Sequence, residues 1–276
     1  MNYNLRTAAK EDVDITISDS AGTVVRKLKG PKTAGLQRVV WDLRAEGVGA
    51  MTTGLAGAHV LTNLGPFVMP GEYKVAVTID GKADTKTVTV KPDPLVELSM
   101  TDRQTLYRTL VTLTDLQRSV TAAADATTKL DERMKQIAET LKPHPNVPAA
   151  IKTSVDGLTK QVADLRTRIM GTGQGFGGGG GGEGPGGPQP LRNRINALKG
   201  EVIGSQSLPT RVQTTSVETL QKQLAEAVGQ VNTVITTTLP GIYKQMHENN
   251  IYPGVGEPIT IVRPTSTAQP GLTREP

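Results

Sequence analysis

The sequence predicts a multi-domain β plus α chain, in which an antiparallel β-sandwich is followed by a four-helix antiparallel bundle with a glycine-rich tether. Three observations predict this fold class. Apolar residues alternate with polar ones between Tyr3 and Lys91, which is the period of a strand. After Pro94 they recur every three or four residues, which is the period of a helix. The segment 171–190 is mostly glycine and proline and cannot continue a helix.

The sandwich is predicted from short strands separated by turn residues. Val13, Ile15 and Ile17 alternate with polar residues, and the turn "DSAG" leads into "TVVRKL" and then "LQRVVWDL". The segment "GEYKVAVTIDGKADTKTVTV" predicts a hairpin, because Asp80-Gly81 suits a tight turn between two alternating runs. Five or six such strands within about 90 residues are typical of a sandwich.

A long apolar connection, from Arg44 to Pro70, interrupts the strands. Its side chains are too apolar for an ordinary solvated loop, so they need a surface to cover. Two interpretations remain open: the loop covers its own sandwich, or it docks on another domain. The single tryptophan, Trp41, is expected in the core. The candidate interaction residues of the loop are Met51, Leu55, Phe67, Val68 and Met69.

Two helices are predicted next, joined by the proline-bearing loop "KPHPNVP". Ser99 or Thr101 can cap the first helix, which then runs to Leu141, and Pro148 is placed early in the second. The predicted apolar seam of the first comprises Leu106, Leu113, Leu116, Val120, Ala123, Leu130, Met134, Ile137 and Leu141. That of the second comprises Ile151, Val155, Leu158, Val162, Leu165 and Ile169.

A second pair of helices is predicted after the glycine tract. Thr215 and Glu218 have the spacing of a capping box, which predicts that the last helix begins there. Pro240-Gly241 should kink or end that helix. The two seams comprise Leu191, Ile195, Leu198 and Val202, and then Val217, Leu220, Leu224, Ala227, Val231 and Val234.

The glycine tract is interpreted as a tether rather than a phosphate-binding loop. A phosphate loop needs a strand before it, and its P-loop form ends in Gly-Lys-Ser/Thr, but here a helix precedes and the tract holds no lysine. As a random coil it reaches about 25 Å, enough to return the chain along the helices. The predicted organisation is sandwich 1–95, helical hairpin 96–170, linker 171–190, second hairpin 191–252 and extended tail 253–276.

Composition excludes several classes of function. The net charge of +5 is spread along the chain without a basic patch, so no nucleic-acid partner is expected. There is no cysteine, and no apolar run reaches the length of a membrane span. The first residues carry no signal peptide, so either the protein is cytoplasmic or the sequence begins downstream of an export signal.

No catalytic, cofactor-binding or metal-binding residue is predicted, and no cofactor is expected. His59, His144 and His247 are far apart in the chain and none has the i, i+4 partner of a helical metal site. Asp12 and Asp14 share a strand face and could hold a calcium ion weakly, but a solvated edge is the favoured interpretation.

The segments "ITISDSAGTVVRKLKGPKTAGLQRVVWDL" and "GPFVMPGEYKVAVTIDGK" resemble an Ig-like module that is similar to that of flagellar hook-capping proteins. Such a module ends the bacterial sortilin-type β-propeller proteins with BNR (Asp-box) repeats, often labelled glycosyl hydrolases. The segments "RINALKGEVIGS" and "VNTVITTTLPGIYKQMHENNI" are similar to the helical part of the same family. The resemblance implies a periplasmic or extracellular location. No Asp-box occurs in this chain, so any hydrolase activity would belong to a propeller and no catalytic residue carries over.

The sequence therefore predicts a non-catalytic accessory module that supports a β-propeller or a cell-envelope partner complex through its apolar loop. The alternatives are a carbohydrate-binding or glycosyl-hydrolase-associated module, and a self-assembling structural protein. The oligomeric state stays open. So does the place of "EPITIVRP", whose Ile259 and Ile261 alternate as in a strand that could join the sandwich.

Overall fold

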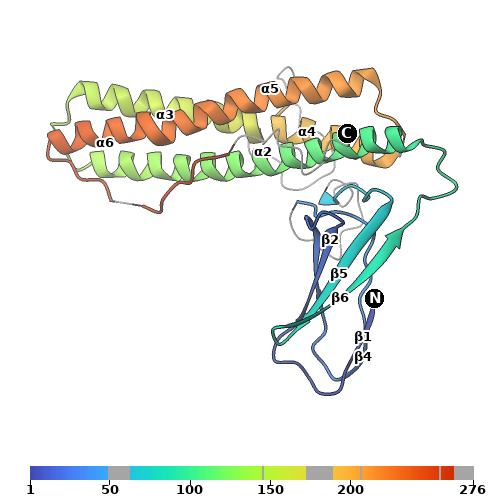
Figure 1. The fold of residues 1–276 in the computed structure, drawn as a ribbon. Coiled ribbons are helices and arrows are strands. Elements are labelled where there is room, and N and C mark those ends of the chain that lie inside the picture. The colour runs from blue at the N-terminus through green and yellow to red at the C-terminus, as the bar shows by residue number, and fades with distance from the viewer. Residues whose placement is uncertain (49–62, 145, 172–188, 206, 255, 264–276) are drawn as a thin grey trace. The chain divides into compact units, whose positions relative to one another are not determined.

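The computed structural model describes residues 1–48, 63–144, 146–171, 189–205, 207–254 and 256–263. Antiparallel β-sheets come first and helices follow (Figure 1). The strands are β1 Asn2–Leu5, β2 Val13–Asp19, β3 Val24–Gly30, β4 Gly35–Arg38, β5 Gly71–Ile79 and β6 Lys82–Val90. The helices are α2 Met100–Leu141, α3 Ala149–Met170, α4 Leu191–Ser205, α5 Arg211–Thr233, the π-helical η1 Val234–Thr238 and α6 Leu239–Glu248.

Packing divides the chain into two compact units. One holds Met1–Thr114 and Lys199–Thr210, and therefore all six strands. The other holds Asp115–Leu198 and Arg211–Ser266.

The strands form a two-stranded sheet, β1-β4, and a four-stranded sheet in the order β3-β2-β5-β6. Strand β2 is central, and its alternation places Val13, Ile15 and Ile17 at 1%, 1% and 0% exposure, as the sequence predicts. Both sheets contribute to one core, with Leu5 from β1 and Tyr73 from β5 among its buried members.

The β5–β6 hairpin confirms the prediction from Asp80-Gly81. Ile79 pairs with Lys82 across this two-residue turn, and both turn residues have positive φ, 47° and 83°. That combination defines a type I′ turn, whose twist matches the twist of the strands it joins.

The expected strand "LQRVVWDL" is only partly formed. Strand β4 ends at Arg38 and pairs with β1 instead of joining the four-stranded sheet. The chain then turns, and Leu43 adopts a left-handed φ of 57°. Trp41 thereby packs against the side of the core without being fully buried.

Most residues of the predicted helical seams are buried, although Leu106 and Leu141, near the two ends of α2, are only half-buried. Ser99 caps α2 by accepting the backbone N–H of Asp102 at 3.1 Å. On α3, the six predicted seam residues are the six that are buried. Thr127 interrupts the α2 seam but is fully buried, because its hydroxyl donates to the carbonyl of Ala124 at 2.9 Å.

Polar contacts join neighbouring helices within the second unit. Gln117 of α2 donates to Asn196 of α4 at 3.0 Å. Arg194 of α4 donates to Gln223 of α5 at 2.7 Å, and Arg168 of α3 forms an ion pair with Glu226 of α5 at 3.2 Å. The apolar stripes of these helices are therefore held in register by side-chain contacts at their margins.

One prediction about the last helix is wrong, and of the two alternatives for Pro240-Gly241, a kink or an end, the end does not occur. The helix begins at Arg211, so Thr215 lies inside α5 and caps nothing. Pro240 does not end the helix, because the preceding turn widens into η1 and the Leu239 N–H bonds the Val234 carbonyl five residues back. This spacing accommodates a proline ring that would otherwise clash with the preceding turn.

The two ends of the glycine tract, Gly171 and Pro190, lie next to each other. Gly171, with φ 91°, lies so close to Pro190 that an added Cβ would be 2.8 Å from the proline ring. The two ends of the tract are therefore adjacent, and the reach of about 25 Å is not needed to place α4.

The segment "EPITIVRP" does not add a strand to the sheets. Its described residues, up to 263, lie on the helices without regular secondary structure. Asn232 of α5 bonds both the carbonyl and the N–H of Val262, at 2.8 and 2.9 Å. Buried Arg133 of α2 donates to the carbonyl of Glu257 at 2.9 Å. We call residues 251–254 and 256–263 the C-terminal strap.

Candidate interaction site at the loop stem

The apolar loop predicted from the sequence is closed at its base by two backbone segments, 43–48 and 63–68, which we call the loop stem. The segments run antiparallel and are joined by an isolated β-bridge between Arg44 and Phe67. Three further backbone bonds extend the bridge: Val68 N–H to Leu43 at 2.9 Å, Ala45 N–H to Pro66 at 2.9 Å, and Val48 N–H to Asn63 at 3.1 Å. The loop stem is thus a fixed structural feature of the sheet region.

Two glycines let the segments approach closely. A Cβ on Gly65 would collide with the carbonyl oxygen of Ala45, and a Cβ on Gly47 would collide with that of Asn63. Both obstacles are backbone atoms, which cannot move aside as a side chain can. The loop stem therefore requires glycine at these two positions.

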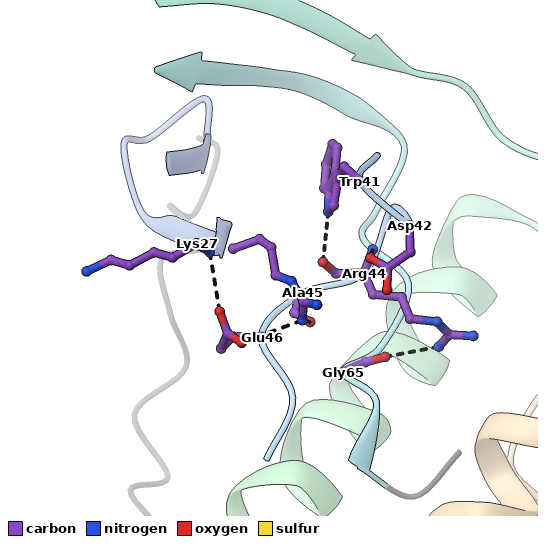
Figure 2. Close-up of polar contacts among 8 residues, drawn as sticks. Lys27, Trp41, Asp42, Arg44, Ala45, Glu46 and Gly65 are labelled. Atoms are coloured by element: carbon purple, nitrogen blue, oxygen red, sulfur yellow. Dashed lines mark hydrogen bonds and ion pairs between the residues drawn. The ribbon is translucent and has the colours of Figure 1, made fainter. Parts of the chain in front are cut away.

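Arg44 covers the exposed ring of Phe67. The guanidinium carbon lies 3.7 Å from the ring centroid, which is a cation–π contact, and Nη1 donates to the carbonyl of Gly65 at 3.0 Å (Figure 2). Burial lowers the pKa of Arg44, and the nearby carboxylate of Asp42 partly opposes that shift. Arg44 and Phe67 are also the two residues of the isolated β-bridge, so the backbone of the loop stem holds the cation over the ring.

Aromatic residues fasten the loop stem to the sheets. Trp41 donates its indole N–H to the carbonyl of Arg44 at 2.9 Å (Figure 2), and its ring meets Tyr73 edge-on at 5.5 Å between centroids. The Tyr73 hydroxyl donates to the carbonyl of Met69 at 2.7 Å, and burial raises the pKa of Tyr73 to about 12. Each aromatic residue thus joins core packing to one segment of the loop.

The loop stem also covers the outer edge of strand β3. The N–H of Glu46 bonds the carbonyl of Val25 at 2.9 Å, and the carboxylate of Glu46 accepts the N–H of Lys27 at 3.3 Å. Arg26 donates to the carbonyl of Ala45 at 3.2 Å and pairs with Glu46 at 3.5 Å. This edge of the four-stranded sheet is therefore occupied.

The five candidate interaction residues fall into different environments. Met51 and Leu55 lie outside the described residues. Phe67 is 45% exposed, whereas Val68 is buried at 8% in the protein's own core. Met69 is half-buried and fixes Tyr73 through its carbonyl. Val68 therefore covers the protein's own sheets, whereas docking on another domain stays a prediction for Phe67, on the opposite side of the extended segment.

Sequence reasoning missed Arg44 as part of this site. The residue opens the loop in the sequence, but its contact with Phe67 depends on closure of a connection more than twenty residues long. Only the two glycines, spaced to flank the loop, could have suggested a close backbone approach there.

The other residues considered as possible metal ligands have ordinary structural roles. Asp14 forms an ion pair with Lys29 on the neighbouring strand, and His247 packs on the ring of Tyr252 at 5.2 Å between centroids. Within the described ranges, no group of three acidic or histidine side chains could hold a metal ion. In the same ranges no helix is long and apolar enough to cross a membrane.

Comparison of the chain with protein families, curated proteins and solved structures finds no match.

Proposed function

We propose that this protein is a non-catalytic interaction module that supports a partner protein, a β-propeller or a cell-envelope subunit, through the loop stem. The observation that carries the proposal is Phe67, a large aromatic side chain kept 45% exposed on a rigid base. Aromatic residues, phenylalanine among them, and arginine are both enriched in protein interfaces relative to the rest of the surface.

The rigidity of the base favours binding over a role as passive cover. Glycine contacts, backbone bonds and the Trp41–Arg44 bond hold the loop stem before any partner arrives. Preorganisation reduces the conformational entropy that association would otherwise cost. The loop stem presents a cation, an aromatic face and polar backbone groups, and these groups suit recognition of a protein surface.

The finer assignment of the fold belongs to the same proposal. We assign the sheets to an Ig-like β-sandwich because both contribute to one core, and the helices to a four-helix antiparallel bundle because α2 to α5 share seams and marginal contacts. The resemblance to the C-terminal region of sortilin-type propeller proteins supports a propeller as partner. It also supports a periplasmic or extracellular site of action.

The test is site-specific photo-crosslinking in the source cells, with a benzophenone analogue of phenylalanine replacing Phe67. We expect one protein to be crosslinked, and peptide mapping to identify it as a propeller or an envelope subunit. Adding Phe67→Asp to a copurification assay should reduce recovery of that protein about tenfold or more, as for a residue at an interface centre. Intact-mass measurement of the native chain tells whether a propeller is covalently attached.

Leu36 provides the matched control, since it is 76% exposed on β4 and lies outside the loop stem. The analogue at position 36 should not capture the same protein. Equal capture at both positions, or a Phe67→Asp variant that keeps full recovery of the partner, would disprove the role of the loop stem. Trp41 fluorescence checks that each variant remains folded.

A further inference from the structure

The two outer edges of the four-stranded sheet differ. Strand β3 is covered by the loop stem through Glu46 and Arg26. Strand β6 pairs only with β5, and its backbone has no other hydrogen bond in the part of the chain that the structure describes. All nine residues of β6 are exposed except the half-buried Val90. A nine-residue edge strand whose pairing has no register shift is a template for another strand.

The turn determines which backbone groups of β6 face outward. In a two-residue type I′ hairpin, the flanking residues Ile79 and Lys82 are bonded to each other, so Lys82 directs its N–H and C=O toward β5. Successive residues alternate in direction. The outward groups therefore belong to Ala83, Thr85, Thr87 and Thr89.

We propose that β6 pairs with β6 of a second copy of this chain, antiparallel about a two-fold axis through Thr85. In this register Thr85 faces its own copy, and Ala83 faces Thr87, in bonded pairs made by the outward groups. Asp84 faces Lys86 twice in the intervening pairs, where side chains lie closest. The two four-stranded sheets become one continuous sheet across the interface.

Charge and overlap together select this register among those that a two-fold axis allows. A centre at Ala83 also sets Lys82 opposite Asp84, but the turn at Gly81 limits the paired strand to residues 82–84. A centre at Lys86 sets two lysines opposite each other, and a centre at Asp84 sets two aspartates opposite each other, both unfavourable. A centre at Thr87 leaves Asp84 and Lys86 facing valines. None of Lys82, Asp84 and Lys86 has an ion-pair partner among the described residues, so the pairing with a second copy competes with no existing contact.

Lysines on an edge strand usually discourage pairing. Here they alternate with Asp84, so they discourage other registers and permit the one centred on Thr85. Lys82 then lies opposite Val88, which is 41% exposed, and its aliphatic stem can cover that side chain. The same pattern therefore excludes random aggregation and specifies a symmetric dimer.

The test is sedimentation equilibrium of the 276-residue chain from micromolar to millimolar concentration. We expect a reversible monomer–dimer equilibrium. Asp84→Lys alone and Lys86→Asp alone should each raise the dissociation constant about tenfold, because each replaces two attractive pairs by two repulsive ones. The double variant Asp84→Lys/Lys86→Asp restores both pairs and should return the constant to within about threefold of the original.

Two further variants separate pairing from folding. Thr85→Pro removes an outward N–H that the isolated hairpin does not use, so dimerisation should be lost while the Trp41 fluorescence melting curve stays unchanged. Lys82→Asp changes the charge of the same strand opposite a valine, and should shift the constant by less than about threefold.

Three outcomes would overturn the proposal. The chain could stay monomeric at every concentration. It could form a dimer that Thr85→Pro leaves intact, which would place the interface elsewhere. Finally, the double variant could dimerise as weakly as the single variants, which would exclude the register centred on Thr85. None of these outcomes bears on Phe67, so the proposal stands or falls independently of the partner role of the loop stem.

Discussion

The helices and the sheets of this protein are stabilised in different ways. The helices bury long aliphatic stripes, and many seam residues, such as Leu113, Leu116 and Ile137, have no exposed surface. Among the described residues, the core of the sheet region contains eight buried side chains and is surrounded by partly exposed ones. Hydrogen bonds from Trp41 and Tyr73 to loop carbonyls complete that smaller core. The helical region therefore depends on packing, whereas the sheet region also depends on closure of the loop stem.

The single tryptophan lies in the sheet region, so its fluorescence follows the sheets while circular dichroism at 222 nm follows the helices. Denaturation monitored by both signals can test each side of the comparison separately.

The largest expected effect comes from a cavity in the helical seam. Leu130→Ala removes a fully buried side chain of α2 and should lower the free energy of unfolding of the helices by about 3 kcal/mol. The 222 nm midpoint in urea should fall, and the Trp41 midpoint should stay. Equal shifts in both signals would show that the two units unfold as one.

Gly65→Ala tests the loop stem directly. The new methyl group collides with the carbonyl of Ala45, so the segments must separate, at a cost of about 2 kcal/mol. We expect a lower Trp41 midpoint in urea with no change at 222 nm. An unchanged Trp41 midpoint would mean that the sheets do not depend on closure of the loop.

Asn232→Ala tests whether the helical region also relies on a polar attachment. The variant loses both bonds to Val262, and the C-terminal strap should open locally with a loss of about 1.5 kcal/mol. Hydrogen exchange should speed up in residues 256–263 and not in α5. Faster exchange throughout α5 would show that the C-terminal strap stabilises the helices as a whole.

Tyr73→Phe removes the bond to Met69 and should cost the sheets about 1 kcal/mol at neutral pH. The substitution should also change how the stability of the sheets falls at alkaline pH. The pKa of Tyr73 is raised to about 12 in the folded protein, against about 10 in an unfolded chain. The contribution is therefore complete below pH 10 and is lost as the pH rises toward 12. Between these values the Trp41 stability curve of the variant should fall less steeply than that of the parent.

The smallest effect should be a gain. Gly157 of α3 has no atom within 4 Å of an added Cβ, so Gly157→Ala should stabilise the helices by about 0.5–1 kcal/mol. The 222 nm midpoint should rise and the Trp41 midpoint should not. It also serves as the matched control for Gly65→Ala, because the same substitution is made where space is available. A destabilised helical transition would contradict the packing described for α3.

Local pattern predicted much of this fold because some elements depend mainly on their own residues. The six seam residues of α3 and the Asp80-Gly81 turn could be identified from spacing alone. One local prediction failed, and one of the two alternatives for Pro240 did not occur, because neighbouring residues offered another solution. Thr215 has a capping sequence, yet the helix begins a turn earlier, and the π-helical turn absorbs Pro240.

The candidate site could be predicted only in part. An apolar loop containing Phe67 was evident, but the separation of Phe67 from Val68 by exposure was not. Arg44 reaches Phe67 only after segments 43–48 and 63–68 have met. No short-range pattern predicts that these two segments pair. Closing the loop between them costs entropy, and contacts between residues distant in sequence offset that cost.

By itself the sequence determined the order of strands before helices, the β5–β6 hairpin and the helical seams, because periodicity and turn chemistry act over a few residues. Only the tertiary structure decided which edge of the sheet is covered, where the C-terminal strap lies and that the two ends of the glycine tract are adjacent. These features depend on which distant backbone groups find a partner. That choice is made by the packed chain as a whole.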